Sequence, residues 1–289
     1  MPKKTSLPSI EVKRLLRQSG LKAKKGLGQH FLIDEKALET IVIAAELSSE
    51  DIVIEVGPGL GVLTIELARR AGKVIAVEFD TKLASLLKRR LASLPNVNIV
   101  NADILKVSPS QLLGGENNYK VVANLPYYVT SPILRYFVEA SPKPSLMIVM
   151  VQKEVGTAIA ASPGKMSLLA ISLQVYSKPK IISYVSSQSF YPQPKVDSAI
   201  VRFDLFPEPA VKIADIDGFF KVVRCGFSSP RKQLRNSLAH GLEVKPAEVG
   251  LLLEKARIEP QRRAETLSLE EWARLYEVLA ASKKDRALC

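Results

Sequence analysis

The chain has 289 residues, of which 47% are hydrophobic and 24% charged, and its formal net charge is +12. This composition excludes a largely disordered protein and provides apolar side chains for one large core or two unequal ones. No apolar run reaches the roughly 18 residues of a membrane span, and the N-terminus has no apolar signal-peptide core, so we expect a cytosolic protein outside membranes. With two cysteines, two histidines and no Cys/His cluster, we expect neither a disulfide framework nor a bound metal.

Residues 1–25 form a strongly basic arm, in which eight lysines and arginines face a single acid, Glu11. The apolar spacing of the arm predicts one short helix over 9–20. Basic segments of this kind attract nucleic-acid phosphates through counterion release. The alternatives are a solvated surface that only keeps the protein soluble, and an amphipathic helix that lies on a membrane surface.

From residue 36 to residue 206, short runs rich in β-branched residues alternate with helical patterns of about ten residues. Such alternation predicts βαβ units and a mostly parallel sheet covered by helices. The predicted fold class is therefore α/β, with a doubly wound, seven-stranded Rossmann-like sheet in a domain that spans 26–206. The predicted strands are 51–56, 73–78, 97–100, 119–123, 145–151, 181–185 and 199–203. A helix over 36–45 precedes the first strand, and helices over 62–71 and 82–93 follow the first and second strands.

The sequence changes character after Phe206, where Pro207 and Pro209 interrupt it. Four helical patterns follow, so we predict a small all-helical domain over 207–289, with the domain boundary at 206/207. The segment Lys221–Arg235 carries five basic residues and no acid, which makes it a second candidate for phosphate contacts. Two separate basic segments on one chain favour a nucleic-acid partner. The predicted helices of this domain are 217–224, 230–239, 247–256 and 269–279.

A glycine-rich turn connects the first predicted strand to a helix, with the sequence Glu55-Val56-Gly57-Pro58-Gly59-Leu60-Gly61. Closely spaced glycines let a ligand approach backbone N–H groups at a helix N-terminus, although a tight turn without a ligand is the simpler alternative. The spacing does not match the G-x-G-x-x-G pattern of dinucleotide sites and is typical of turns that hold S-adenosylmethionine. Glu78 ends the next strand, where a carboxylate accepts ribose hydroxyls, and Asp103 follows the third strand. Acids at the tips of three consecutive strands predict an adenosyl-ligand site.

The tetrad Asn124-Leu125-Pro126-Tyr127 directly follows the fourth predicted strand, at the edge where open α/β sheets bind ligands. An exocyclic adenine amine is a poor nucleophile because its lone pair is delocalised into the ring. The Asn124 side-chain oxygen and the Leu125 carbonyl can accept the amine hydrogens and so localise the lone pair towards a methyl donor, while Tyr127 stacks on the base. An Asx-Pro turn is the structural alternative. Beside an adenosyl site, the tetrad predicts amine methylation without a dedicated general base.

Five further stretches are distinctive: Gly28-Gln29-His30-Phe31-Leu32, Asp103-Ile104-Leu105, Gln152-Lys153-Glu154-Val155, Phe190–Arg202 and Arg231–Leu238. Together with the glycine turn, Glu78 and the tetrad, they resemble the ribosomal RNA adenine N6,N6-dimethyltransferase family, and most of all its small-subunit branch. The resemblance extends in order over about residues 24–280.

This resemblance implies an enzyme of ribosome biogenesis that dimethylates the N6 amines of two adjacent adenines near the 3′ end of small-subunit rRNA. It implies S-adenosylmethionine as the methyl donor, S-adenosylhomocysteine as the product and no metal. The implied partners are small-subunit rRNA and the pre-assembled small ribosomal subunit, and we expect the protein itself to be a monomer.

The resemblance also assigns roles to individual residues. Phe190 should sandwich the target base against Tyr127, as expected when a nucleotide is drawn out of its stack. Pro230 stands where the family commonly has a basic residue, and after Ser229 it suits the first position of a helix. The implied cofactor residues are His30, Leu32, Gly57, Gly59, Glu78, Asp103, Ile104 and Asn124; the catalytic residues are Asn124, Leu125, Pro126, Tyr127 and Phe190; and the residues on rRNA phosphates are Arg231, Lys232 and Arg235.

Two other functions remain open. The large-subunit methyltransferases that confer macrolide resistance share the fold, although the stretches 190–202 and 231–238 favour the small-subunit branch. A non-catalytic RNA- or DNA-binding factor on the same fold is the alternative of a different class. The intact tetrad and the three acids argue against it, and methyl incorporation into RNA distinguishes the two.

Overall fold

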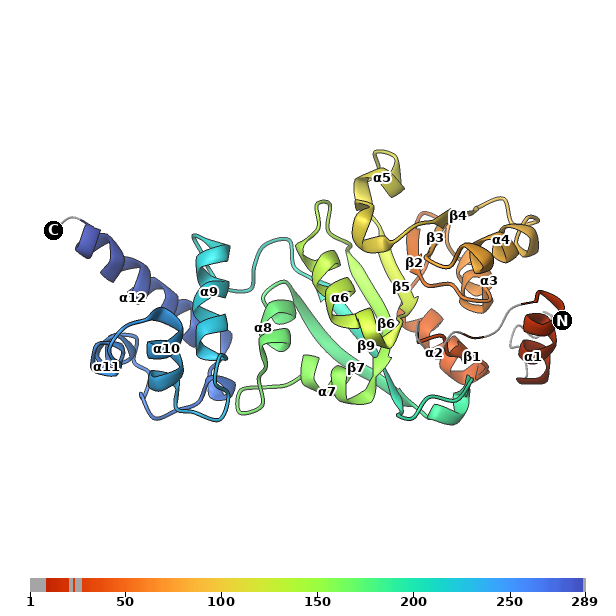
Figure 1. The fold of residues 1–289 in the computed structure, drawn as a ribbon. Coiled ribbons are helices and arrows are strands. Elements are labelled where there is room, and N and C mark those ends of the chain that lie inside the picture. Colours follow the sequence, from red (N-terminus) through yellow and green to blue (C-terminus); the bar gives the residue numbers. More distant parts are fainter. Residues whose placement is uncertain (1–8, 21–22, 24–27, 288–289) are drawn as a thin grey trace. The chain divides into compact units, whose positions relative to one another are not determined.

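The computed structural model of the protein describes residues 9–20, 23 and 28–287 (Figure 1). Of the predicted basic arm, residues 1–8, 21–22 and 24–25 therefore lie outside the described part of the chain. The helix predicted within the arm is confirmed as α1 (Ser9–Gln18). Among the described residues, no helix is both long enough and apolar enough to cross a membrane.

Seven strands form one sheet in the order β4-β3-β2-β5-β6-β9-β7, which confirms the predicted α/β class. The strands from β2 to β6 pair in parallel, whereas β9 is antiparallel to β6, with Ser198 opposite Gln152. The direction in which successive strands are added to the sheet reverses between β2 and β5. In doubly wound sheets, ligands bind in the crevice at the carboxyl ends of the two strands at such a reversal. The strands are β2 (Ile52–Val56), β3 (Lys73–Glu78), β4 (Val97–Asn101), β5 (Lys120–Asn124), β6 (Leu146–Gln152), β7 (Ser177–Val185) and β9 (Ser198–Leu205).

Helices between the strands cover the sheet and begin at caps that the sequence provides. Asp34 caps α2 and Asp80 caps α4, and each accepts the backbone N–H groups two and three residues further along. Helices α3 and α4 pack on β3, and α2 packs on β6. Their apolar faces form a core in which Ile41, Leu67 and Val74 are fully buried. These helices are α2 (Glu35–Ala44), α3 (Val62–Ala68), α4 (Thr81–Arg90), α5 (Pro109–Leu113), α6 (Thr130–Glu139) and α7 (Lys153–Ile159).

A short antiparallel pair, which the sequence did not indicate, joins two distant segments. β1 (Phe31–Leu32) pairs with β8 (Phe190–Tyr191). Beside the pair, the backbone N–H of Ile33 donates to the Ser189 carbonyl (2.9 Å), and the Ser189 hydroxyl donates to the Asp34 carboxylate (2.6 Å). Strands of two residues have no detectable periodicity, so only the folded chain reveals them. The pair brings the stretches 28–32 and 190–202 together.

Contacts divide the described residues into two compact units. The first consists of those in Met1–Thr157 and Lys178–Leu205, and the second of those in Ala158–Ser177 and Phe206–Cys289. The second unit therefore includes α8 (Leu168–Gln174), which lies before the predicted boundary at 206/207.

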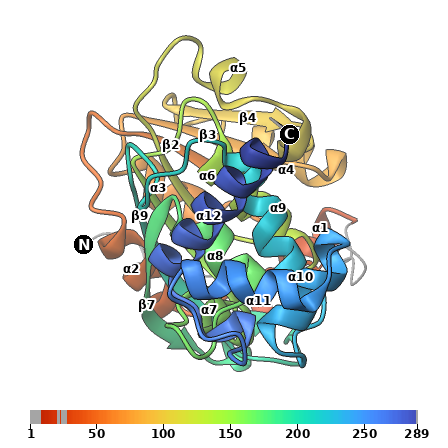
Figure 2. The same cartoon turned by 90° about the vertical axis from the view of Figure 1, so that its left-hand side faces the viewer.

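The second unit is helical, and Figure 2 shows its helices packed together. Aromatic side chains are buried among them. Phe219 and Trp272 are fully buried, and the Trp272 ring stacks on Phe227 with centroids 5.8 Å apart. A side chain on Gly226 would collide with Trp272, so this glycine allows the close approach. The helices after α8 are α9 (Ile216–Gly226), α10 (Leu234–Leu242), α11 (Pro246–Lys255) and α12 (Leu269–Ala287).

Candidate active site

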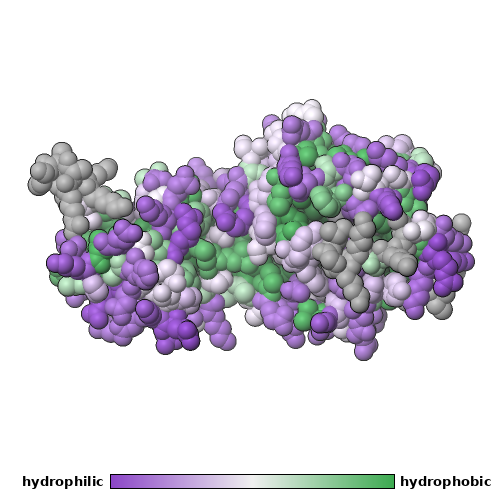
Figure 3. Space-filling view, in the orientation of Figure 1, coloured by the Kyte–Doolittle hydropathy of each residue, from purple (hydrophilic) through white to green (hydrophobic). Residues whose placement is uncertain are grey.

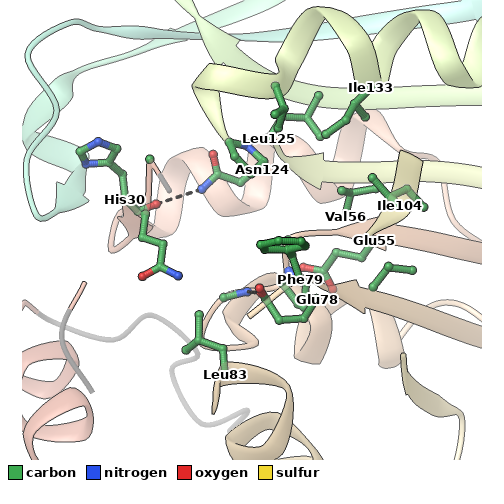
Figure 4. Close-up of a pocket in the computed structure, with 18 of the residues that line it drawn as sticks. His30, Glu55, Val56, Glu78, Phe79, Leu83, Ile104, Asn124, Leu125 and Ile133 are labelled. Carbon is green, nitrogen blue, oxygen red and sulfur yellow. Dashed lines mark hydrogen bonds between the residues drawn. The ribbon is translucent and has the colours of Figure 1, made fainter. Parts of the chain in front are cut away.

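The carboxyl ends of β2, β3, β4 and β5 border a pocket of about 280 Å³ (Figure 4). These strands are neighbours in the sheet, so residues at their tips meet although they are far apart in the sequence. All the residues predicted around an adenosyl ligand line this pocket, and so does the whole predicted tetrad. The first set is His30, Leu32, Gly57, Gly59, Glu78, Asp103, Ile104 and Asn124, and the tetrad adds Leu125, Pro126 and Tyr127.

The glycine turn between β2 and α3 has a left-handed backbone at three positions. The φ angles of Gly57, Gly59 and Gly61 are 67°, 59° and 77°, a region that other residues enter only with strain. A side chain on Gly59 would meet the Phe31 ring at 3.2 Å, and one on Gly61 would meet Leu87 at 2.8 Å. The turn therefore brings bare backbone to the pocket.

Glu78, at the end of β3, connects this strand tip to the glycine turn. Its carboxylate accepts the backbone N–H of Gly59 (3.3 Å) and the backbone N–H of Asp80 (2.8 Å). The residue is only 6% exposed, and burial raises the pKa of Glu78 although both hydrogen bonds oppose the change. The carboxylate is thus fixed in one orientation at the pocket.

Asp103, which follows β4, is both a helix cap and part of the pocket wall. Its Oδ1 accepts the backbone N–H of Leu105 (3.1 Å) and caps the 3-10 helix η2 (Ile104–Lys106). Asp103 therefore caps a helix and borders the pocket with the same side chain. Among the described residues, no group of three or more His, Cys, Asp or Glu side chains is arranged to hold a metal ion.

Glu55 precedes the glycine turn and is almost completely buried, at 1% exposure. Its Oε2 has no hydrogen-bond partner among the described residues. Burial raises the pKa of Glu55 to about 8, although the neighbouring Thr64 side chain acts in the opposite direction, and the nearby charge of Glu78 adds to the rise. A buried carboxyl with an unpartnered oxygen favours a ligand that is cationic or donates hydrogen bonds.

Asn124 ends β5, and its amide is held in place from across the pocket (Figure 4). The amide Nδ2 donates to the backbone carbonyl of His30 (3.2 Å), 94 residues away in the sequence. Because the nitrogen of the amide is engaged there, Oδ1 points to the other side and can accept a hydrogen bond. Both residues were expected at one site from the sequence, whereas the orientation of Asn124 by His30 was not.

Tyr127 begins the 3-10 helix η3 (Tyr127–Val129) and is fixed at two points. Its hydroxyl lies 2.6 Å from the Ser198 hydroxyl, and its ring stacks on the His30 ring with centroids 5.7 Å apart and planes inclined by 26°. The His30 ring donates in turn from Nδ1 to the Pro192 carbonyl (2.6 Å). Burial raises the pKa of Tyr127, so the phenol stays neutral.

Ser198 is a site residue that sequence reasoning missed. It is fully buried at the start of β9, and it reaches the tetrad because β9 is antiparallel to β6. The start of β9 therefore lies at the same sheet edge as the ends of the parallel strands. The only available signal was its membership of the stretch 190–202, which the resemblance had marked without assigning it a role.

Phe190, predicted to clamp the target base, does not line the pocket. It is 3% exposed and packs in the main core together with Leu32. The pairing of β8 with β1 explains this position, since Phe190 lies opposite Leu32 in the register. In this structure the ring stacked on Tyr127 is that of His30, so the clamp by Phe190 stays a prediction.

An apolar rim at the pocket also escaped the sequence analysis. Phe79, Tyr128 and Leu105 line the pocket and are 59%, 55% and 39% exposed, which is unusual for side chains of this size. Burial, together with the charges of Asp103 and Glu78, raises the pKa of Tyr128, so its phenol lies near both acids. Each of the three directly follows a predicted site residue in the sequence, and this position was the available signal that they line the pocket. An apolar rim above carboxylates suits a flat ring attached to a sugar.

The predicted phosphate contacts lie in the second unit, before and within α10. Arg231 and Lys232 are exposed, on a turn that the Lys232 N–H closes by donating to the Ser229 carbonyl (2.9 Å). Arg235 lies in the first turn of α10 and is half-buried, and its Nε is buried without a hydrogen-bond partner among the described residues. Two of the three predicted side chains are thus freely accessible to an anion.

The predicted start of α10 at Pro230 is wrong, because the helix begins at Leu234. Gln233 has an extended backbone and takes the N-cap position. The N–H of Leu234 donates to the Arg262 carbonyl (2.7 Å), a partner in a distant loop. This long-range contact fixes the helix start, whereas the preference of proline for a first helical position is only local.

Comparisons with known proteins agree with the geometry. The sequence pattern of a family described as ribosomal RNA adenine dimethylase matches residues 20–281. The ribosomal RNA small subunit methyltransferase A of Dehalococcoides mccartyi (strain ATCC BAA-2266 / KCTC 15142 / 195) is 51% identical over 273 residues, which are 94% of each chain. The protein of the same description from Alkaliphilus metalliredigens (strain QYMF) is 41% identical over 94% of this chain and 96% of that one.

Two solved structures are similar over most of the chain. A dimethyladenosine transferase from Plasmodium falciparum matches with a TM-score of 0.73 at 25% identity, over 89% of this chain and 98% of that chain. The 23S rRNA methyltransferase ErmE matches with a TM-score of 0.69 at 31% identity, over 86% of this chain and 99% of that chain. The similarity in fold therefore extends over most of the chain.

Proposed function

The chain belongs to the ribosomal RNA adenine dimethylase family, and we propose that it transfers methyl groups from S-adenosylmethionine to N6 amines of adenines in small-subunit rRNA. More specifically, two adjacent adenines near the 3′ end each receive two methyl groups. The observation that carries this proposal is that the oriented amide of Asn124 lines the same pocket as Glu78 and Asp103. An acceptor for a target amine thus stands beside carboxylates suited to an adenosyl group.

The side chains of the pocket fit S-adenosylmethionine in charge and in shape. Glu78 would accept the ribose hydroxyls, Asp103 and Ile104 would border the adenine, and the bare backbone of Gly57 and Gly59 would face the rest of the molecule. The unpartnered Oε2 of Glu55 supports a ligand with positive charge, because such a ligand favours the ionised carboxylate. When bound, the cofactor supplies an electrophilic methyl group on a positively charged sulfur.

The base side of the pocket positions the target amine and needs no general base. The His30 carbonyl holds the amide nitrogen of Asn124, so Oδ1 is preorganised to accept one amine hydrogen. The Leu125 carbonyl is the second acceptor. Acceptors in fixed places draw the amine hydrogens out of the ring plane and localise the lone pair, while the fixed ring of Tyr127 receives the face of the base.

RNA recognition belongs to basic surfaces outside the pocket. Arg231, Lys232 and Arg235 would contact phosphates, and the exposure of the first two supports this role. The proposed partner is the pre-assembled small ribosomal subunit, the product is S-adenosylhomocysteine, and the protein acts as a monomer in the cytosol. The small-subunit names of the relatives at 41–51% identity support the choice of RNA.

Methyl transfer from tritiated S-adenosylmethionine to immature small subunits, with large subunits as the matched control, tests the proposal. We expect label in small-subunit rRNA alone, with primer-extension stops at two adjacent adenines. Label in large-subunit rRNA alone would instead support the second candidate, a large-subunit methyltransferase, which the similarity to ErmE favours. If the protein binds the cofactor and labels neither RNA, the enzymatic proposal is wrong and a non-catalytic RNA-binding factor is favoured.

A further inference from the structure

Helices α1 and α4 are far apart in the sequence and share one hydrophobic cluster. Val12 and Leu16 of α1 are 0% and 6% exposed, and they pack with Leu83 of α4. Phe31 and Leu60, which also line the pocket, complete the buried part of this cluster. The packing holds α1 beside α4, and both lie on the right in Figure 1.

The outward faces of these two helices are basic. Their sequences together contain seven lysines and arginines and one acid, Glu11. Figure 3 shows hydrophilic side chains gathered at the right-hand end of the view, where the two helices lie. The exposed basic residues are Lys13, Arg14 and Arg17 on α1 and Lys82, Lys88 and Arg89 on α4.

These side chains differ from several other basic residues of the same unit, which form ion pairs with acids. Arg69 and Arg70 both form ion pairs with Glu66, and Arg202 forms one with Glu46. The Lys13 ammonium lies over the Tyr191 ring, 5.1 Å from its centroid. In the described part of the chain, no ion pair involves Arg14, Arg17, Lys82, Lys88 or Arg89.

Helix stability does not account for this arrangement. Lys88 and Arg89 lie in the last turn of α4, where the helix dipole favours cations. Lys82 lies in the first turn of α4, where the dipole disfavours a cation. Packing a second basic helix beside the first adds repulsion between like charges. An extended polyanion removes both unfavourable terms at once, because its phosphates neutralise several cations together.

We propose that the α1–α4 basic surface, made of Arg14, Arg17, Lys82, Lys88 and Arg89, binds backbone phosphates of the RNA substrate. The choice of RNA as the partner rests on the proposed function. This surface belongs to the same unit as the pocket, and it adds phosphate contacts to those predicted for Arg231 and Lys232 in the second unit. Two shared pocket-wall residues, Phe31 and Leu60, anchor α1, so the surface has a fixed place in that unit.

The test measures binding of the full chain to a fragment of small-subunit rRNA at several salt concentrations, with S-adenosylhomocysteine present. Each neutralised phosphate contributes about −0.7 to −0.9 to the slope of log affinity against log salt. Lys88→Ala/Arg89→Ala should therefore make the slope shallower by about 1.5, and Arg14→Ala/Arg17→Ala should do the same. The matched control, Lys178→Ala/Lys180→Ala, removes two exposed lysines from β7 and should leave the slope unchanged.

If both double variants have the same salt-dependence slope as the wild type, the proposal is wrong. An equal loss of slope in the control pair would overturn it as well, because net charge alone would then explain the effect. Wild-type affinity for S-adenosylhomocysteine in each variant, measured by calorimetry, shows that the pocket is intact. The assay of methyl transfer by the wild-type protein separates the two proposals: an active enzyme with unchanged slopes contradicts only the surface, whereas an inactive wild type contradicts the proposed function.

Discussion

The two sides of the pocket are built by different means. On the adenosyl side, Glu78 and Asp103 each accept the backbone N–H two residues further along, Glu78 also accepts that of Gly59, 19 residues before it, and Glu55 lies one residue before the end of its strand. On the base side, the partners of Asn124 and Tyr127 are 94 and 71 residues away. The carboxylates proposed to bind the cofactor are thus positioned mainly by their own strands, whereas the residues proposed to orient the target base are positioned by long-range contacts. Substitutions on the two sides should therefore have separable effects on affinity and rate.

The largest expected effect is on the base side. Asn124→Ala removes the oriented acceptor, so single-turnover methyl transfer should fall by about 10²–10³, the usual effect of losing one preorganised polar group at a reacting centre. Cofactor affinity should stay within a few-fold of wild type. Rapid-quench measurements with saturating tritiated S-adenosylmethionine test this. A variant that retains the wild-type rate would show that Asn124 takes no part in the chemistry.

On the adenosyl side, Glu78→Ala removes an acceptor for two hydroxyls. Each charge-assisted hydrogen bond contributes about 1.5–3 kcal/mol, and about 1.4 kcal/mol corresponds to a factor of ten, so affinity should fall at least roughly tenfold. Glu78→Gln is the matched variant, because it keeps one acceptor oxygen and should lose less. Isothermal titration calorimetry measures both constants. Unchanged affinity in a folded Glu78→Ala protein would place the adenosyl group elsewhere.

A smaller effect is expected from the hydroxyl pair that fixes Tyr127. A neutral hydrogen bond contributes about 0.5–1.5 kcal/mol, so Ser198→Ala and Tyr127→Phe should each lower the rate by roughly two- to tenfold. If Ser198 acts only by positioning Tyr127, the double variant should be no slower than the slower single variant. Cofactor affinity should not change in any of the three. Multiplicative rate losses in the double variant would show that the two residues act independently.

The last expected effect is on the stability of the protein, through its dependence on pH, and leaves rate and affinity aside. Burial raises the pKa of Glu55 from 4.5 to about 8, so the folded protein holds this proton more tightly than the unfolded chain does. The resulting stabilisation is complete below about pH 4.5 and is lost as the pH rises through about 8. The Tm of the ligand-free protein should fall over this interval, and less steeply in Glu55→Gln. Parallel Tm curves from calorimetry at several pH values would contradict this account.

The same comparison explains what could be predicted from the sequence. A buried parallel strand has a run of β-branched residues in the sequence. Glu78 is the last residue of its strand and Asp103 comes two residues after the end of its strand, so the strands and both acids were visible locally. Contacts such as Ser198 with Tyr127 have no local signal, because strand order and direction create them. Only the resemblance assigns Phe190 to a base clamp; the pairing of β8 with β1, which has no local signal either, places its side chain in the core of this structure, and the clamp stays a prediction.

The most direct test of the account is a crossed measurement on Glu78→Ala and Asn124→Ala, in which the cofactor Kd and the single-turnover rate at saturating cofactor are determined for both. The account predicts that Glu78→Ala has a Kd raised at least roughly tenfold and a rate within a few-fold of wild type. For Asn124→Ala it predicts a Kd within a few-fold of wild type and a rate lowered by about 10²–10³. If each variant instead loses affinity and rate together, the two sides of the pocket do not separate binding from chemistry.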